Sequence, residues 1–187
     1  LIIILNKNEL VTQNWIEKAS KYKNVSVYKL PENVTLGECL NFGVRKAKYN
    51  YIAKFDDDDY YGPNYLTSML KVFHNTNASI IGKKTIYIYF ESRKLLTIHR
   101  PNFENRYLNH VAGATLMFKK EIIKKVTFPN LNIGSDVKFQ QQCLLNGFKI
   151  YSADKHNYTC VRRKNIKDHT WKVTEKDLLK NCKKVCH

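Results

Sequence analysis

Long apolar runs are missing from this sequence of 187 residues. A helix that crosses a lipid bilayer needs about 20 consecutive apolar residues, and the opening run ends at Leu5. Glycine and proline are also scarce, with seven and four residues, which excludes a collagen-like or low-complexity chain. We expect no secretory signal peptide, because no basic start is followed by an apolar stretch and a small-residue cleavage site.

Cysteine is present, but not in the pattern of a disulfide framework. The five cysteines are odd in number and widely spaced: Cys39, Cys143, Cys160, Cys182 and Cys186. We therefore expect a reducing, cytoplasmic location. Cys182, Cys186 and His187 have a helical spacing that suits part of a zinc site. Three ligands without a partner pair favour a frayed, basic terminal helix instead.

Acidic residues are half as numerous as basic ones, 16 against 32, which gives a net charge of +16. A chain this basic favours a polyanion partner, such as nucleic acid, an anionic membrane surface or a phosphorylated small molecule. Residues 155–187 alone hold ten basic and three acidic side chains. Basic residues interleaved with stacking aromatics do not occur, so we expect no nucleic-acid partner. Peripheral contact with an anionic membrane surface stays open.

The order of apolar segments predicts one α/β domain. Strands alternate with helices in the first half, which is typical of a parallel sheet. The strands expected there are residues 1–5, 25–29 and 51–55, and the helices are 12–22, 35–47 and 63–74. The second half favours antiparallel strands at 79–82, 85–90, 95–99, 114–118 and 149–153, with a helix at 136–145. We expect a mostly parallel sheet with antiparallel strands in the second half, and residues 155–187 packed on domain 1–154.

Side-chain patterns predict where these elements end and which faces they bury. Thr12 is expected to cap its helix, and Thr35 and Glu38 have the spacing of a capping box. The run Leu1–Leu5 is typical of a strand buried on both faces. The helical residues expected to point inward are Trp15, Ile16 and Ala19; Leu36, Leu40, Val44 and Ala47; and Tyr65, Leu66, Met69, Leu70 and Phe73.

The most informative feature is the run of four aspartates, Asp56–Asp59, at the end of a predicted strand. Ligands of open α/β sheets bind beyond the carboxyl ends of the strands. Adjacent carboxylates repel one another unless a cation lies among them, and Mg²⁺ and Mn²⁺ prefer such oxygen ligands. The alternative is a solvated acidic turn ahead of the helix that Pro63 begins. We prefer the metal site, because the rest of the chain is rich in lysine.

Four motifs lie around this acidic run. They are Gly37-Glu-Cys-Leu-Asn-Phe-Gly43; residues 47–59 followed by Pro63-Asn-Tyr-Leu66; His110-Val-Ala-Gly-Ala-Thr-Leu-Met-Phe118; and Gly134-Ser-Asp136 with the helix after it. Together they resemble family 2 glycosyltransferases of the GT-A fold, with the Asp-x-Asp motif, the acceptor-side strand and the Glu-Asp motif in the family's order. The resemblance covers most of residues 1–155. It implies transfer of a sugar from a nucleotide-diphosphate sugar to a saccharide or other hydroxyl acceptor. The donor that we expect is a UDP-sugar.

The resemblance also implies roles for the acidic residues. Asp58 is expected to bind the metal, Mn²⁺ or Mg²⁺, and Asp56 to face the ribose or the metal's water shell, with Asp57 as an alternate. Asp136 is similar in position to the catalytic base of inverting members, although Ser135 replaces the usual Glu before it. Asn6 falls where an Asp commonly reads the uracil edge, and an amide adds a hydrogen-bond donor there.

Other donor-site residues are expected on the same resemblance. Gly37 and Asn41 lie on the Gly-rich helix beside the donor, and Arg163 or its neighbour Arg162 could neutralise the diphosphate. His169 could be a third metal ligand, or the tail could simply be basic with Trp171 packed on the core. We interpret His110 as a packed or rim residue rather than a catalytic one.

Two alternatives to an active transferase stay open. One is a degenerate GT-A domain, because the first strand of that fold has no counterpart ahead of Leu1, so either the sequence is truncated or the copy is incomplete. The other is a polyanion-binding module without catalysis. The aspartate run argues against this second alternative, because four carboxylates repel a phosphate backbone unless a metal bridges them.

Overall fold

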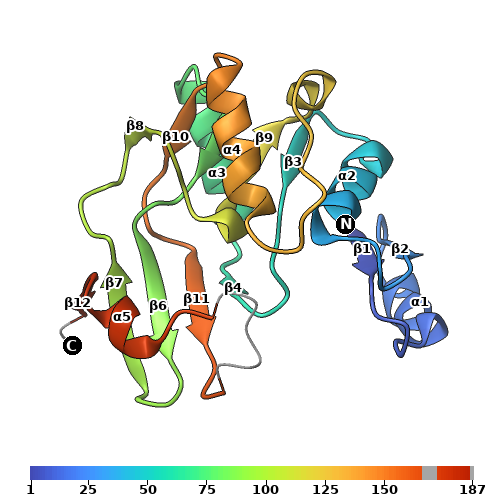
Figure 1. The fold of residues 1–187 in the computed structure, drawn as a ribbon, viewed down its shortest axis with the longest axis horizontal. Coiled ribbons are helices and arrows are strands. Elements are labelled where there is room, and N and C mark those ends of the chain that lie inside the picture. The colour runs from blue at the N-terminus through green and yellow to red at the C-terminus, as the bar shows by residue number, and fades with distance from the viewer. Residues whose placement is uncertain (166–171, 186–187) are drawn as a thin grey trace.

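The computed structural model describes residues 1–165 and 172–185 (Figure 1). In this part of the chain the strands form a two-stranded sheet and two five-stranded sheets. The elements, in chain order, are β1 (Ile2–Leu5), α1 (Thr12–Ser20), β2 (Ser26–Lys29), α2 (Leu36–Lys46), β3 (Tyr51–Ala53), β4 (Tyr60–Tyr61), α3 (Tyr65–Asn75), β5 (Ile80–Gly82), β6 (Ile86–Phe90), β7 (Leu95–His99), β8 (Arg106–Leu108), the 3-10 helix η1 (Gly113–Thr115), β9 (Met117–Lys119), the 3-10 helix η2 (Lys120–Lys124), α4 (Ser135–Leu145), β10 (Ile150–Ser152), β11 (Tyr158–Arg162), α5 (Glu175–Leu179) and β12 (Cys182–Lys184).

The two-stranded sheet pairs β1 with β2 in parallel and lies at one end of the molecule (Figure 1). α2 connects it to the rest, because Phe42 packs edge-on against Tyr28 of β2 while Val44 is buried in the core of the neighbouring sheet. The predicted burial of Leu1–Leu5 on both faces is wrong. Leu1 is 69% exposed and only Leu5 of the run is fully buried, since β2 is the only strand partner of β1 in the described residues.

Helix ends match the sequence prediction in α2 and depart from it in α1. Thr35 accepts a hydrogen bond from the Glu38 backbone N–H, and the Glu38 carboxylate accepts one from the Thr35 N–H, so the capping box is confirmed. In α1 the cap position is Val11, which has no capping side chain, and Thr12 is already helical. The prediction for Thr12 is therefore wrong.

Four apolar residues predicted to face inward are exposed: Trp15, Ile16, Leu36 and Leu66. In α1 only Ala19 is buried. In α3 the buried residues Tyr65, Met69 and Phe73 follow one another at steps of four. Leu66 lies about 100° around the helix from that narrow stripe, so it reaches solvent.

The first five-stranded sheet has the order β3-β9-β5-β10-β8 and is covered by helices on both faces. On one face Phe139 and Cys143 of α4 pack with Ile80 and with Val44 of α2. On the other face α3 packs Met69 and Phe73 in a second cluster with Ile81. This three-layer arrangement fixes the end of β3, which the acidic run follows, and the start of β9, which η1 precedes.

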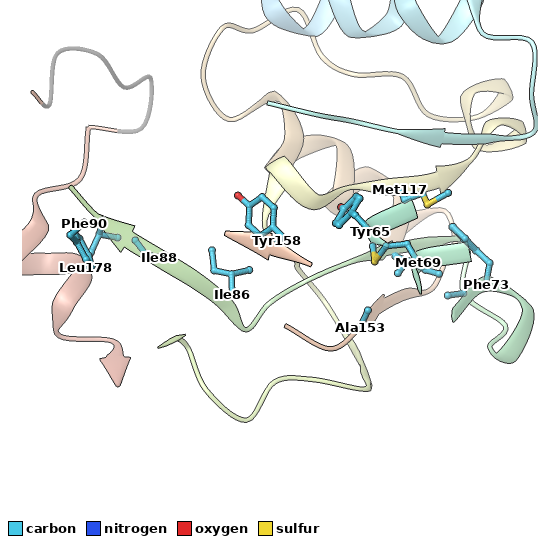
Figure 2. Close-up of a cluster of buried hydrophobic side chains, with 12 residues drawn as sticks. Tyr65, Met69, Phe73, Ile86, Ile88, Phe90, Met117, Ala153, Tyr158 and Leu178 are labelled. Atoms are coloured by element: carbon cyan, nitrogen blue, oxygen red, sulfur yellow. The ribbon is translucent and has the colours of Figure 1, made fainter. Parts of the chain in front are cut away.

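The second five-stranded sheet has the order β12-β7-β6-β11-β4. β6 and β7 are antiparallel strands, as the sequence predicts, and they form a hairpin with Phe90 opposite Leu95. One apolar cluster joins this sheet to α3 of the first layer, and Figure 2 shows it extending from Phe73 through Tyr65 and Tyr158 to Phe90 and Leu178. The two sheets therefore share a core.

The fold class is confirmed as α/β, but the sheets contain more antiparallel pairing than predicted. Three of the nine strand pairs in the described residues are parallel, namely β1–β2, β5–β10 and β6–β11, and six are antiparallel. The main cause is β9, which comes from later in the chain and enters antiparallel between β3 and β5. Its predicted strand at 114–118 is shorter, because η1 occupies Gly113–Thr115.

Helices long and apolar enough to cross a membrane are absent from the described residues. Cys39, Cys143, Cys160 and Cys182 are free thiols there. Four residues with predicted roles lie outside the described part of the chain: His169, Trp171, Cys186 and His187.

Candidate active site

The acidic loop, Asp56–Asp59, lies between β3 and β4. Its first residue is held by a relay of hydrogen bonds. The Asp56 N–H donates to the Tyr61 hydroxyl at 2.9 Å, and that hydroxyl donates to the Ala114 carbonyl at 2.7 Å. The Lys54 N–H also donates to the Leu116 carbonyl. The loop is therefore attached to η1 and the start of β9.

The carboxylates of this loop have different surroundings. Asp59 accepts hydrogen bonds from the Tyr158 hydroxyl at 2.5 Å and from the Val161 N–H at 3.0 Å. Burial raises the pKa of its carboxyl, and these two bonds oppose that rise. Asp56 forms an ion pair with Lys54, whereas Asp57 is exposed and Asp58 half-buried. Asp59 thus joins the loop to β11, whereas Asp57 is exposed to solvent.

Aromatic side chains pack against one another on both sides of the acidic loop in the sequence, at Phe55, Tyr61 and Tyr65. The Tyr61 ring lies 4.4 Å from that of Phe55 and 5.0 Å from that of Tyr65, centroid to centroid. Burial raises the pKa of both Tyr61 and Tyr65, so both phenols stay protonated and donate hydrogen bonds. The Tyr65 hydroxyl donates to the Thr115 carbonyl at 3.0 Å. Two tyrosines therefore hold η1 through consecutive carbonyls.

Asp136 lies in the first turn of α4, on the other side of η1. The helix begins after Gly134, whose φ of 77° is left-handed and suits glycine. A Cβ on Gly113 would lie 1.5 Å from the Asp136 Oδ2, so the carboxylate occupies space that only a glycine leaves free. We call this close approach the Asp136 contact.

The side chain of Gln140 fixes the same segment of chain to α4. It is fully buried, accepts from the Val111 N–H at 2.9 Å and donates to the Val111 carbonyl at 3.1 Å. Since Gly113 and Ala114 are adjacent, η1 touches Asp136 with one residue and the relay to Asp56 with the next. The structure thus brings Asp56 and Asp136, which are 80 residues apart in the sequence, to two sides of one short turn.

Only part of a metal site is preformed. No group of three or more His, Cys, Asp or Glu side chains in the described residues is arranged to hold a metal ion. Mg²⁺ commonly uses one or two protein carboxylates and takes its other ligands from water and substrate phosphates. The acidic loop fits that mode, because its neighbouring carboxylates are hard oxygen donors of the kind that Mg²⁺ prefers.

Three predicted donor residues have structural contacts. The Asn6 side chain donates to the Pro31 carbonyl at 2.7 Å. A Cβ on Gly37 would lie 1.8 Å from the Pro129 oxygen, so Gly37 permits a loop to pack on α2. Both halves of the Asn41 amide bind the backbone of Phe128. These contacts give all three residues a structural role, and their roles at the donor site stay predictions.

The arginines at the end of β11 differ from each other. Arg162 is buried and donates to the Val173 carbonyl at 2.8 Å, which fixes the chain ahead of α5. Arg163 is exposed. His110 is half-buried, and burial together with the charge of Lys84 lowers the pKa of its imidazole. The interpretation of His110 as a packed or rim residue agrees with this burial.

Several residues of this site were missed by sequence reasoning: Lys54, Tyr61, Gly113 and Gln140. The small-residue run Ala112–Ala114 was a usable signal for a close backbone approach. Nothing in the sequence distinguishes Asp59 from its three neighbours, because its role depends on β11 and Tyr158.

Comparison with known proteins identifies the family. A family model described as Glycosyl transferase family 2 matches residues 1–129. The chain belongs to this family. Its fold is the GT-A fold of these transferases, because two crystal structures of S. aureus TarS superpose with TM-scores of 0.64 and 0.65 over 86% of this chain. Their sequence identities to this chain are 18% and 16%, so the similarity supports the fold alone.

The chain is also similar in sequence to the Minor teichoic acid biosynthesis protein GgaB of Bacillus subtilis. It is 25% identical over 147 residues, which cover 71% of this chain. This family 2 chain spans only 16% of GgaB, and 50% and 30% of the two TarS chains.

Proposed function

We propose that this chain transfers a sugar from a nucleoside-diphosphate sugar to an acceptor hydroxyl with inversion at the anomeric carbon. The observation that carries the proposal is η1, which holds the acidic loop on one side through Tyr61 and meets the Asp136 carboxylate on the other at Gly113. A donor diphosphate at the loop and an acceptor hydroxyl at Asp136 would then meet across this single turn.

Asp136 acts in this proposal as the general base. A hydroxyl is a weak acid, so a positioned carboxylate that accepts its proton during attack lowers the barrier. Gly113 and Gln140 keep the carboxylate and its helix in place, which is the rigid support that such a step needs. The proton leaves the acceptor oxygen as the new glycosidic bond forms and the bond to the diphosphate breaks.

Asp58 and Asp56 are the proposed ligands of Mn²⁺ or Mg²⁺, with Asp57 as an alternate. A divalent ion supplies charge stabilisation for the leaving diphosphate. Lys54 forms an ion pair with Asp56, so a metal ion that binds Asp56 has to compete with the lysine. Arg163, which is exposed after β11, is proposed to contact the diphosphate. His169 is proposed as a further ligand of the metal. We propose Asn6 as a base contact of a uridine nucleotide.

A shallow depression beside the acidic loop is a candidate place for a sugar ring. It measures about 400 Å³ and is lined by Tyr60, Tyr89, Lys94, Leu96, Thr159 and Val161. It adjoins the loop, because Tyr60 follows Asp59 and the Val161 N–H donates to the Asp59 carboxylate.

The proposed location is a reducing, cytoplasmic one. The free thiols in the described residues support this proposal.

The test is a donor-hydrolysis screen over nucleotide sugars with Mn²⁺ or Mg²⁺, followed by calorimetry of UDP with and without the metal. We expect turnover of at least one donor and UDP binding that requires the metal. A chain that hydrolyses no donor but binds UDP would be a degenerate transferase. Failure to bind any nucleotide diphosphate would reject the proposed function.

A further inference from the structure

Helix α1 exposes several large apolar side chains close together. This helix lies at one end of the molecule (Figure 1), and Ala19 is its only buried residue. Four large apolar side chains within residues 11–22 are exposed: Val11 to 59%, Trp15 to 36%, Ile16 to 44% and Tyr22 to 68%. Apolar side chains that gather in this way on a surface mark a site of interaction with a protein or a membrane.

Three of these side chains share one side of α1. Val11 is the N-cap residue, four positions before Trp15, and Tyr22 follows the C-cap residue Lys21, seven positions after Trp15. Lys21 keeps helical backbone angles, and the Tyr22 N–H donates to the Ala19 carbonyl at 3.0 Å, so the helical spacing extends to Tyr22. Residues at spacings of four and seven lie above one another on a helix. We call Val11, Trp15 and Tyr22 the α1 seam.

Lysines lie along the α1 seam without acidic partners. The Lys18 ammonium is 5.2 Å from the centre of the Trp15 ring, and Lys21 and Lys23 are exposed at the C-terminal end of the helix. In the part of the chain that the structure describes, no carboxylate forms an ion pair with these three lysines. The only acidic residue of α1, Glu17, lies about 160° around the helix from Trp15. The positive charge beside the seam is therefore uncompensated.

The types of residue on and around the α1 seam favour a lipid surface over a protein partner. Tryptophan and tyrosine rings concentrate at the interface between a membrane and water, where one end of the ring is in an apolar medium and the other is wet. Lysine side chains extend their apolar stems along such a surface and keep their ammonium groups among the lipid headgroups. Interfaces between proteins are instead depleted in lysine and enriched in arginine, and residues 1–44 contain lysine but no arginine.

We propose that the α1 seam, together with Lys18, Lys21 and Lys23, binds the surface of an anionic phospholipid bilayer. A helix of nine residues is too short to cross a membrane, so α1 would lie in the plane of the interface with the seam inserted among the headgroups. The three lysines supply the attraction to lipid phosphates. This inference goes beyond the proposed function and does not rest on it, because α1 contributes no residue to the acidic loop or to the Asp136 contact.

The test is binding to vesicles, with a tryptophan of the chain as the reporter. The chain contains two tryptophans, Trp15 and Trp171, so Trp171→Phe leaves Trp15 as the only one. Vesicles of phosphatidylglycerol mixed with phosphatidylcholine are compared with vesicles of phosphatidylcholine alone. With the mixed vesicles we expect co-sedimentation and a shift of the Trp15 emission to shorter wavelength, because the ring leaves water. Raising the salt concentration from about 0.1 M to about 0.5 M should weaken this binding by roughly fivefold or more.

Two variants locate the contact on α1. Trp15→Ala removes the ring, and Lys18→Gln combined with Lys21→Gln removes two positive charges. All three side chains are exposed, so the fold should survive both changes. We expect each variant to lose affinity for the mixed vesicles by roughly fivefold or more, because insertion of the ring and attraction of the lysines both contribute to binding.

Two controls make the same changes elsewhere on the chain. Leu145→Ala removes a large apolar side chain that is 79% exposed at the end of α4. Lys71→Gln combined with Lys176→Gln removes two exposed lysines of α3 and α5. Both controls should keep their affinity for the mixed vesicles within about twofold of the wild type. Binding of UDP with Mn²⁺ should be unchanged in the controls and in the α1 variants.

Three results would overturn the inference. The first is failure of the wild type to bind the mixed vesicles, or equal binding to phosphatidylcholine alone. The second is equal affinity for the mixed vesicles in the wild type and both α1 variants, which would place the membrane contact elsewhere. The third is a dimer in analytical ultracentrifugation without vesicles that Trp15→Ala abolishes, which would show that the seam binds a second copy of the chain. Normal UDP binding alongside any of these results would leave the proposed function standing.

Discussion

The acidic loop and the Asp136 contact hold their carboxylates in opposite ways. In the loop, Asp56 and Asp59 are fixed by side-chain and backbone partners that a substitution can remove one at a time. At the Asp136 contact, the carboxylate lies in the space that Gly113 leaves free because it has no side chain. Its position is set by α4, in whose first turn Asp136 lies. The loop should therefore respond to substitutions in graded steps, whereas small steric changes at Asp136 should have large effects on catalysis.

The largest effect is expected from Asp136→Asn. The amide keeps the shape and loses the basicity, so kcat should fall about 1,000-fold while UDP affinity stays within about twofold. Steady-state kinetics with the donor found in the hydrolysis screen, paired with calorimetry, separates the two quantities. Equal losses of turnover and of UDP affinity would move Asp136 to the donor or metal site.

Gly113→Ala tests the steric half of the comparison. The new methyl group would overlap the Asp136 Oδ2, so the carboxylate has to move and kcat should fall about 100-fold. Gly147→Ala is the control, because its φ of 79° makes alanine strained but no atom lies within 4 Å of the added Cβ. The control should lose about 1 kcal/mol of stability and keep its turnover. Full turnover in Gly113→Ala would show that the close approach is irrelevant to catalysis.

Substitutions of two neighbouring aspartates test whether the effects in the loop differ from residue to residue. Asp59→Ala leaves the Tyr158 hydroxyl and the Val161 N–H without their acceptor, which should cost about 2 kcal/mol in the free energy of unfolding. Asp58→Ala removes the proposed metal ligand and should abolish metal-dependent UDP binding. Thermal denaturation and calorimetry on both variants provide the check, and undiminished UDP–Mn²⁺ affinity in Asp58→Ala contradicts the ligand assignment.

An effect on stability that depends on pH, and not on catalysis, is expected at His99, the last residue of β7. Burial lowers the pKa of this imidazole from 6.5 to about 4. The unfolded chain takes up the proton at the higher pH, so stability is retained above pH 6.5 and is lost as the pH falls toward 4. The loss should be roughly 2 to 3 kcal/mol. His99→Gln should reduce the difference between urea midpoints at about pH 7 and about pH 4.5, and an unchanged difference would exclude His99 as its cause.

Sequence reasoning succeeded where local chemistry decides the structure. The capping box at Thr35 and Glu38 and the antiparallel strands β6 and β7 depend on residues close in sequence, and both are confirmed. Asp136 was identified as a site residue, but only its resemblance to a family motif indicated it. Its catalytic role stays a prediction.

The failures share a different cause, which is contact between distant segments. β9 enters between β3 and β5, and no periodicity within residues 114–118 encodes its direction. The structural role of Asp59 depends on β11, and the inward prediction for Trp15 and Ile16 failed because α1 buries only Ala19. Short elements such as β4 and β8, of two and three residues, are also too brief for a periodic signal.

The hydrogen bond from the Val161 N–H to Asp59 has a consequence for biosynthesis. It joins residues 102 positions apart, and β10, the strand between β5 and β8, also comes late in the chain. Contacts of long sequence separation form slowly and only after both partners have been made. On the ribosome, we expect the acidic loop to stay unordered until β11 has emerged from the exit tunnel, so nascent chains that end before Tyr158 should bind no nucleotide.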